Sequence, residues 1–459
     1  MRIVTIAWVF GAAWMHAVAG APLTVFAQAL GCSNFEFGIL AAMPFVAALL
    51  SLPASVWIDR SGRRNVIFAI GLYANRVLWF PLALLPIVVL TYGGATYAGV
   101  AIALFLILTF LMHAGQAIGG PAWVSWMADI VPEAIRGRYF ARRRQWGIPS
   151  AIGAALLAGW AVDRYATGSQ SAILWTCAIV FMAASVLGIV DIALFHKVPH
   201  AVRPKPREPL LRTLVGPLRN AQFVSFSIGT AILMFAIAGQ GQFVNKYLVE
   251  HLHLKSVQVQ LMVLVGPLLA QLLVLPIWGL AIDRYGKKPA MLIAILGLVP
   301  VGFGWVLISA EHVWLGYVLA ILGSAMWTGV EVANFNMVME LSGTDQRGYQ
   351  GGSAYMAVNA VIINVAGCAG GIFFGSVAEL LSDLNYKTGW WWLAEISYYH
   401  VLFILSAVLR LIAVVPMLRV REPEAAPTLD TLRFMTGSLY NNVVGVVMLP
   451  VRLFRGRPE

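Results

Sequence analysis

A charged six-residue turn that occurs twice limits what this chain can fold into more than any other feature. The first copy is Asp59-Arg60-Ser61-Gly62-Arg63-Arg64 and the second is Asp283-Arg284-Tyr285-Gly286-Lys287-Lys288, so both read Asp-Arg-x-Gly-basic-basic. Each copy stands between two long apolar runs, and the second begins about half of the 459-residue chain after the first. A turn repeated at that spacing predicts two structurally similar halves.

A second pair of charged sites supports the same division. Asp129 ends an apolar run in the first half, and Arg136-Gly137 follows it seven residues later. Glu340 and Arg347-Gly348 repeat this arrangement in the second half. The order of apolar runs and charged turns is therefore the same in both halves.

Composition identifies the medium that surrounds these runs. The chain is 60% hydrophobic and only 11% charged, whereas a soluble domain averages about 25% charged residues. So large an apolar fraction predicts an all-α integral membrane protein, because helices satisfy their own backbone polar groups in lipid. The three cysteines lie far apart in sequence and form no metal-binding pattern, so we expect no metal ion or other cofactor.

Twelve apolar runs are near the roughly 20 residues that a membrane-spanning helix needs. They predict one six-helix bundle over residues 1–195 and another over 223–419, joined by a proline- and arginine-rich linker over 196–222. Residues 420–459 predict an amphipathic segment on the membrane surface. The predicted spans are 3–30, 38–57, 66–90, 98–127, 146–166, 171–195, 223–249, 258–281, 290–309, 314–340, 351–381 and 398–419.

The lysine and arginine positions predict the orientation in the membrane. If the two Asp-Arg-x-Gly turns face the cytoplasm, all but six of the 31 Lys and Arg residues lie on the cytoplasmic side. Because cytoplasmic loops are enriched in these residues, we expect both termini inside and a location in the cytoplasmic (inner) membrane. The net charge of +11 then belongs to a membrane face, so the expected partner is the lipid bilayer and not nucleic acid. The six exceptions are Arg76, Arg164, Lys246, Lys255, Lys387 and Arg410.

The turns also carry a resemblance. They are similar to the Gly-x-x-x-Asp-Arg-x-Gly-Arg-Arg/Lys signature between helices 2 and 3 of the major facilitator superfamily. The second copy fits it from Gly279 onward, and the first has Ser55 in place of the leading glycine. The resemblance covers the chain except its last forty or so residues. It implies two six-helix bundles around a central cavity, which helices 1, 4, 7 and 10 line and helices 3, 6, 9 and 12 support from outside.

The resemblance also implies a function. We expect secondary active transport of a small polar solute by alternating access, with a proton or another ion as the coupling partner. A non-transporting membrane receptor or scaffold on the same fold is the alternative. An enzyme is not expected, because the sequence clusters no catalytic set. Helix 5 reads Gly147-Ile148-Pro149-Ser150-Ala151-Ile152-Gly153, which departs from the Gly-Pro-x-x-Gly-Gly signature of drug antiporters in this superfamily.

The charged turns are the expected gate. Glycine supplies the backbone freedom of a tight turn, and a carboxylate can accept from a helix N-terminus or pair with arginine. On this interpretation the clusters latch the cytoplasmic side in one access state and separate in the other; a basic loop that only sets orientation is the simpler alternative. The gating candidates are Asp59, Arg60, Gly62, Arg63, Arg64, Asp129 and Arg136, and in the second half Asp283, Arg284, Gly286, Lys287, Lys288, Glu340 and Arg347.

Glu331 is the expected coupling acid. It precedes Glu340 by nine residues, which places it roughly 14 Å inside the membrane. Ser324, Trp327 and Asn334 share its helix face. An ionisable group at that depth is costly and is a functional candidate by default. A structural pair with a buried arginine is the alternative.

Further polar residues fall on the helices that the resemblance places around the cavity. They are candidates for substrate or proton binding, although a lone buried histidine more often only packs. Arg76 and Arg410 fall on the outer helices 3 and 12, so we interpret them as structural partners, and Lys246 as a side chain that reaches the membrane surface. The candidates besides Glu331 are Asn334, Trp327, His113, Gln116, His16, Gln28, Gln240 and Asn245.

Overall fold

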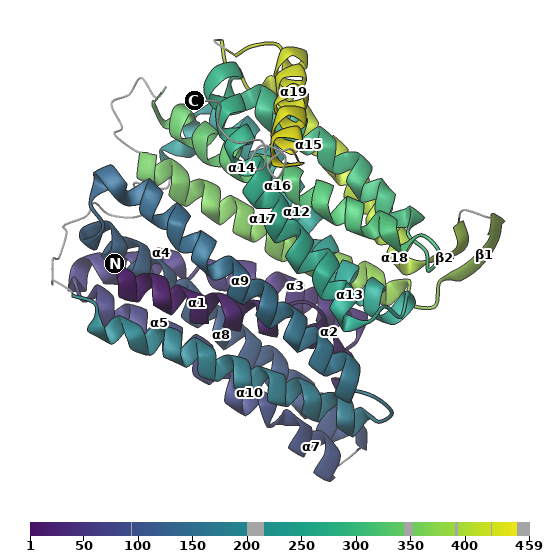
Figure 1. Cartoon of the computed structure of the whole chain (residues 1–459). Helices are drawn as coiled ribbons and strands as arrows, with labels where there is room; N and C mark the ends of the chain where they lie inside the picture. Colours follow the sequence, from purple (N-terminus) through teal and green to yellow (C-terminus); the bar gives the residue numbers. More distant parts are fainter. Residues whose placement is uncertain (93, 200–214, 344–351, 391–392, 424, 448–459) are drawn as a thin grey trace, which may run out of the picture.

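A computed structural model describes the chain apart from residues 93, 200–214, 344–351, 391–392, 424 and 448–459 (Figure 1). The first half is helical throughout its described length. Its elements are α1 (Arg2–Val18), α2 (Ala21–Leu30), α3 (Asn34–Ala48), α4 (Ser51–Ser61), α5 (Arg64–Val77), α6 (Trp79–Ala83), α7 (Leu85–Tyr92), α8 (Gly94–Ile130), α9 (Glu133–Tyr165), α10 (Gln170–Leu194) and η1 (Phe195–Lys197).

The second half repeats this layout and adds a small hairpin and a terminal helix. Its elements are η2 (Pro217–Arg219), α12 (Ala221–Lys246), η3 (Tyr247–His251), α13 (Ser256–Gln260), η4 (Leu261–Val265), α14 (Gly266–Tyr285), α15 (Lys287–Gly304), η5 (Trp305–Leu307), α16 (Val313–Gly343), α17 (Gly352–Leu380), β1 (Asn385–Trp390), β2 (Leu393–Ser397), α18 (Tyr398–Arg419) and α19 (Thr428–Val447).

The predicted all-α membrane fold of twelve spans in two bundles is confirmed. In the described chain ten helical stretches are long and apolar enough to cross a membrane, and α1 with α2 form an eleventh that bends by 42°. The bend lies at Gly20, whose φ of 73° is readily available only to glycine. The twelfth long helix is α9, which has 33 residues and packs along α1.

Two stretches differ from the sequence prediction. The fifth span was expected to begin at residue 146, but α9 begins at Glu133, because Pro132 has the extended backbone that precedes a helix. The charged stretch after Asp129 is therefore mostly helix and not loop. The stretch between the predicted spans 351–381 and 398–419 was expected to be only a connection, and it includes an antiparallel hairpin of β1 and β2, with Tyr386 opposite Ile396.

The two ends of the bundle have different contents, and we name them by these. The turn face carries Met1 and both Asp-Arg-x-Gly turns. The hairpin face carries β1, β2 and the N-terminal end of α3. In Figure 1 the labelled N-terminus lies at one end of the molecule and the β hairpin lies at the other.

The apolar core shows where the halves join. One cluster of buried residues contains side chains of both halves, including Phe26, Phe181, Phe243 and Tyr399, which belong to the hairpin-face part of the bundle. Two further clusters are confined to one half each: one contains Phe68 and the other contains Trp278 with its neighbours toward the turn face. The halves therefore share a core at the hairpin face and have separate cores at the turn face.

Candidate functional site

A buried polar contact ties the halves together at the hairpin face. Asn34, the first residue of α3, accepts hydrogen bonds at Oδ1 from the Lys246 amine and from the Tyr398 hydroxyl, the latter at 3.0 Å. Its Nδ2 donates to the carbonyl of Ala378 at 3.2 Å. Lys246 is buried and lies between the halves, so the interpretation of its side chain as one that only reaches the membrane surface was wrong.

A second contact joins α9 to α13. The carboxylate of Asp163 accepts from the backbone N–H groups of Ser256 at 2.5 Å and Val257 at 2.9 Å, at the N-terminus of α13. A carboxylate at a helix N-terminus is favoured both by these free donors and by the helix dipole. Nearby, Gln260 donates to the carbonyl of Ala19 at 3.1 Å, next to the bend between α1 and α2.

Backbones of the two halves also approach closely where α3 meets α17. A Cβ atom on Gly38 would lie 2.5 Å from the Cα of Gly375, and one on Gly371 would lie 2.7 Å from the nitrogen of Ala42. Small residues permit such close packing of membrane helices. Helix α4 continues the membrane span that α3 begins, and it packs mainly on α8 and α5 of its own half. Contact between the halves is therefore concentrated toward the hairpin face.

At the turn face the ion pair that the structure describes in the first half joins two helices of that half. Arg64 opens α5 and pairs with Asp129 at the end of α8; their side chains are 2% and 27% exposed. Asp59 is 8% exposed, and Gly62 ends α4 with a φ of 64°. The Arg64–Asp129 pair therefore joins α5 to α8 within one bundle.

The second turn is joined to the C-terminal segment. Lys287 pairs with Glu340 of α16 and lies 3.6 Å from a carboxylate oxygen of Glu422. Glu422 also accepts from the backbone N–H groups of Lys287 at 3.0 Å and Lys288 at 2.7 Å. The carbonyl of Tyr285 accepts from Ala426 at 2.8 Å. The segment before α19 thus covers the turn.

The remaining gating candidates form no charged contact between the halves in the described part of the chain. Asp283, Arg60 and Arg63 are exposed, and the Arg284 guanidinium lies 5.7 Å from the ring of Phe434 in α19. Arg347 and the side chain of Arg136 lie outside the described residues. Gating by these groups stays a prediction.

A cavity of about 330 Å³ lies in the second half, between α12, α14, α15, α16 and α18. Its polar lining comes from Gln240, Ser324, Trp327 and Arg410, and the rest of the wall is apolar or glycine. Gln240 and Trp327 are two of the residues that the sequence singled out, and the fold brings them to one site.

Arg410 is buried in this wall as an anchored cation. It donates to Gln240 Oε1 and to the carbonyl of Leu298 at 2.8 Å. The Ser406 hydroxyl donates to the same Gln240 oxygen at 3.0 Å. The guanidinium therefore joins α18, α12 and α15, as expected of a structural residue, while its position also gives the cavity a positive potential.

Glu331 lies one turn beyond Trp327 on α16 and is exposed. Its Oε1 accepts from the indole N–H of Trp327 at 2.9 Å. Other sides of α16 are covered, because Gly329 packs against Trp278 of α14. Asn334 bonds Asn359 of α17 at 3.3 Å. Glu331 is thus coupled to the cavity through Trp327, whereas Asn334 is turned toward α17.

Arg76 has the structural role that was expected of it. It lies 3.5 Å from a carboxylate oxygen of Asp191 in α10 and also donates to Asn75. Its guanidinium lies 3.5 Å from the centre of the Trp14 ring in α1. The cluster therefore ties α5, α10 and α1 together inside the first bundle.

The other candidates occupy four different settings. Gln28 is part of the contact between the halves, since it donates to Glu250 at 2.9 Å. His16 is half-buried, and its Nδ1 lies 2.9 Å from the carbonyl of Ala12 on the same helix. His113 is half-buried and Gln116 is exposed, both on α8. The Oδ1 of Asn245 is buried without a hydrogen-bond partner among the described residues.

The sequence reasoning missed the residues that hold the hairpin face together. A serine at the start of α13 is an ordinary helix-start signal, but nothing local indicates that Asp163 caps that helix from the other half. Likewise, no periodicity links Asn34 to Lys246, which are 212 residues apart. The missed residues are Asn34, Asp163, Ser256, Gln260 and Tyr398.

Comparison with known proteins gives a family match and several fold matches. Residues 3–371 match the family model described as Major Facilitator Superfamily. No curated protein matches the sequence. A mutant of the nucleoside transporter NupG has a TM-score of 0.67 at 13% identity, over 92% of this chain and 99% of that chain. The D-xylose-proton symporter has a TM-score of 0.57 at 15% identity, over 94% and 98%.

A third solved structure was determined in two states. A bacterial homologue of the iron transporter ferroportin in its inward-facing state has a TM-score of 0.64 at 13% identity, over 91% of this chain and 98% of that chain. The outward-facing state, with soaked iron, has a TM-score of 0.56 at the same identity and coverage. At these identities the similarity concerns the fold alone.

Proposed function

The chain belongs to the major facilitator superfamily, and we propose that it is a secondary active transporter that moves a small polar organic solute across the cytoplasmic membrane by alternating access. The observation that carries this proposal is the uneven contact between the halves. They share one core at the hairpin face and have separate cores at the turn face. Two rigid bundles joined at one end are what a rocking movement of one bundle against the other requires.

The turn face is the cytoplasmic face in this proposal. The lysine and arginine residues of both turns and of the first part of α9 lie there, and such residues accumulate on the cytoplasmic side of membrane proteins. The described conformation is then the one open to the cytoplasm. The higher TM-score with the inward-facing ferroportin homologue, 0.64 against 0.56, supports this. A phosphatase fused to the C-terminus should be inactive in the periplasm; an active fusion would reverse the orientation.

The cavity beside Arg410 is the proposed solute site. Its volume of about 330 Å³ is at the lower end of the roughly 300–1,000 Å³ of small-molecule sites. Ser324 and Gln240 supply hydrogen-bonding groups, and the Trp327 indole supplies a flat apolar wall. A solute with polar groups and a compact apolar part would fit this lining.

Glu331 is the proposed proton carrier. Its carboxylate accepts from Trp327, which lines the cavity, so a change in its protonation alters the position of a wall residue. A protonated carboxyl also moves between access states without carrying a charge through the membrane. These two properties would couple solute movement to a proton gradient.

The test begins with finding the solute. Purified protein is screened by thermal shift against a panel of polar metabolites, and each stabilising compound is tested for uptake into proteoliposomes with an imposed pH gradient. Glu331→Gln, which mimics the protonated acid, should abolish accumulation driven by the gradient while leaving exchange down the solute's own gradient. Glu311→Gln, an exposed acid at the hairpin face, is the matched control.

Two outcomes would contradict the proposal. If no compound that binds the protein accumulates in proteoliposomes, the receptor or scaffold alternative is favoured. If Glu331→Gln accumulates solute as well as Glu311→Gln does, the chain is a transporter whose coupling does not involve Glu331.

A further inference from the structure

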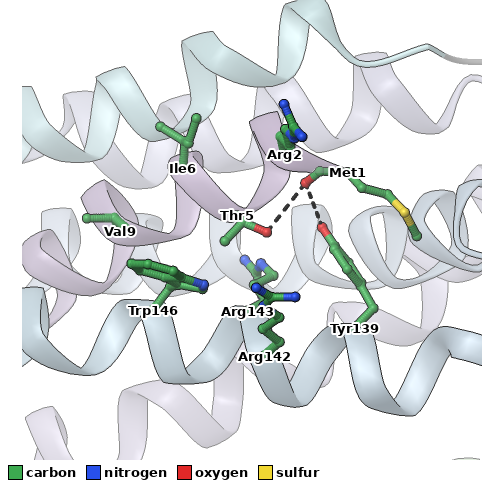
Figure 2. A pocket seen from close by; sticks show the side chains of 9 residues that line it. All are labelled: Met1, Arg2, Thr5, Ile6, Val9, Tyr139, Arg142, Arg143 and Trp146. Atoms are coloured by element: carbon green, nitrogen blue, oxygen red, sulfur yellow. Dashed lines mark hydrogen bonds between the residues drawn. The ribbon is translucent and has the colours of Figure 1, made fainter.

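A groove of about 540 Å³ lies between the first turns of α1 and the adjoining side of α9 (Figure 2). Guanidinium groups of Arg2, Arg142 and Arg143 line it, and none of the described residues in its lining is acidic. Farther along α1 the lining is apolar, with Ile6 and Val9. The groove therefore has a cationic part and an apolar part.

The groove opens on the outer surface of the first bundle. On α9, Gly159 and Asp163 contact α13 of the other half. Trp146 lies on the other side of the helix and is 58% exposed, and the exposed row continues with Leu157 and Trp160. In Figure 1, α1, α9 and α10 lie side by side on the near surface. Large exposed apolar side chains in a row along a spanning helix face lipid, so the groove does too.

The three arginines are held differently. Arg143 is fixed, because its guanidinium lies 4.4 Å and 4.8 Å from the ring centres of Trp8 and Trp123. Its Nε also donates to the carbonyl of Val4 at 3.3 Å. Arg2 and Arg142 are exposed, and neither forms an ion pair within the described part of the chain. Two guanidinium groups with free donors thus stand beside a fixed third charge.

The level of the groove in the membrane selects the kind of anion. Arg2 is the first residue of α1, so the cationic part lies at the turn-face boundary of the membrane. Tyr139 and Trp146 flank it, and such aromatic residues are enriched at the headgroup level. Ile6 and Val9 lie deeper, at the level of acyl chains. A free anion would use only the cationic part, whereas a lipid would use both.

We propose that this groove binds an anionic phospholipid, with its phosphate on Arg2 and Arg142 and an acyl chain along Ile6, Val9 and Trp146. Guanidinium groups bind phosphate through two parallel hydrogen bonds. A zwitterionic headgroup is attracted less strongly, because its own cation offsets the charge of its phosphate. The bound lipid would bridge α1 and α9 where they begin. With the orientation proposed above, it belongs to the cytoplasmic leaflet.

The test is native mass spectrometry of the full-length protein in detergent with added phosphatidylglycerol. Loss of one arginine at an anionic surface lowers affinity about five-fold, so Arg2→Gln/Arg142→Gln should lower the affinity of the tightest lipid site about 25-fold. Arg144→Gln is the matched control, because it removes the same charge from α9 on the side that contacts Gln271 of the other half. Arg142→Lys keeps the charge and should retain most of the binding, which separates loss of charge at the groove from misfolding of the double variant.

Three results would overturn the proposal. Equal loss of lipid in Arg144→Gln and in the double variant would mean that only the total charge matters. Unchanged lipid binding in a double variant that elutes as a single species would place the lipid elsewhere. Displacement of phosphatidylglycerol by inorganic phosphate at equal concentration would show a simple anion site. Preference for phosphatidylglycerol over phosphatidylcholine, lost only in the double variant, is the expected result.

Discussion

The charged and polar contacts at the two ends of this molecule differ in which helices they join. At the turn face, Arg64–Asp129 and Lys287–Glu340 each join helices of the same half. At the hairpin face, Asn34–Lys246 and Asp163–Ser256 join one half to the other. Contacts within a half can persist while the halves move, whereas contacts between halves must break. We therefore expect the charged turns to fasten each bundle and the hairpin face to open.

The largest expected effect comes from the buried fastener of the first half. Asp129→Asn replaces the carboxylate that pairs with the Arg64 guanidinium, which is only 2% exposed, by a neutral amide. Removing one partner of a buried pair costs about 3–5 kcal/mol, and we expect about 3 kcal/mol here because Asp129 is partly exposed. The measurement is the unfolding midpoint in detergent, with Glu340→Gln as the control in the second half. A smaller loss for Asp129→Asn than for Glu340→Gln would contradict the difference in burial.

The second fastener depends on the C-terminal segment. Glu422→Gln weakens the acceptor of two backbone N–H groups at the second turn, in a side chain that is only 5% exposed. Hydrogen bonds to a charged group contribute about 1.5–3 kcal/mol each, so we expect a loss of about 2.5 kcal/mol because the amide still accepts one bond. Unfolding is again the measurement. A change in the accessibility of the hairpin face without loss of stability would make Glu422 a gate and not a fastener.

A substitution at the contact between the halves should change the population of the open state more than the stability of the bundles. Asp163→Asn weakens two bonds to α13, at 2.5 and 2.9 Å, which stabilise only the state closed at the hairpin face. A loss of about 2 kcal/mol would raise the population open at that face about 30-fold while leaving each bundle intact. The midpoint of unfolding should therefore change less than in Asp129→Asn.

Cys32 can report that opening. It lies between α2 and α3, and burial raises the pKa of its thiol to about 12. When the hairpin face opens, that desolvation is lost, the pKa falls toward its ordinary value, and the reactive thiolate becomes more abundant at pH 8. Labelling by a maleimide in a Cys177→Ser/Cys368→Ser background should become faster in Asp163→Asn and not in Asp129→Asn. Equal rates in both would remove the distinction between the two ends.

The smallest effect is expected at the exposed fastener. Lys287 and Glu340 are each about one-third exposed, at 31% and 34%. Lys287→Gln should cost about 1 kcal/mol, and less at high salt, because such pairs are weak and screened. Arg433→Gln, whose side chain is 81% exposed, is a control with no expected change. A loss as large as that of Asp129→Asn would show that the two turns are equivalent after all.

The amino-acid sequence by itself determined the membrane fold and its division into halves. The length of an apolar run and its flanking charges are local properties, so twelve spans could be counted and the positive face identified from the chain alone. The structural interpretation of Arg76 and Arg410 came from the resemblance, which places their helices 3 and 12 on the outside of the bundles. Helix boundaries were predicted less well where a helix carries charged residues. The arginine-rich first part of α9 was left out of the predicted span, which began at residue 146.

Tertiary structure alone decided which end of the bundle is closed and which polar groups meet. Gln28, a candidate for substrate or proton binding, contacts Glu250 of the other half, 222 residues away in sequence. Lys246 was expected at the membrane surface but is buried against Asn34. The groove on α1 and α9 likewise depends on which sides of two helices adjoin. Hydropathy reflects the free energy of moving each side chain out of water, which is a local property. These contacts depend on how helices far apart in sequence pack, and no local pattern contains that information.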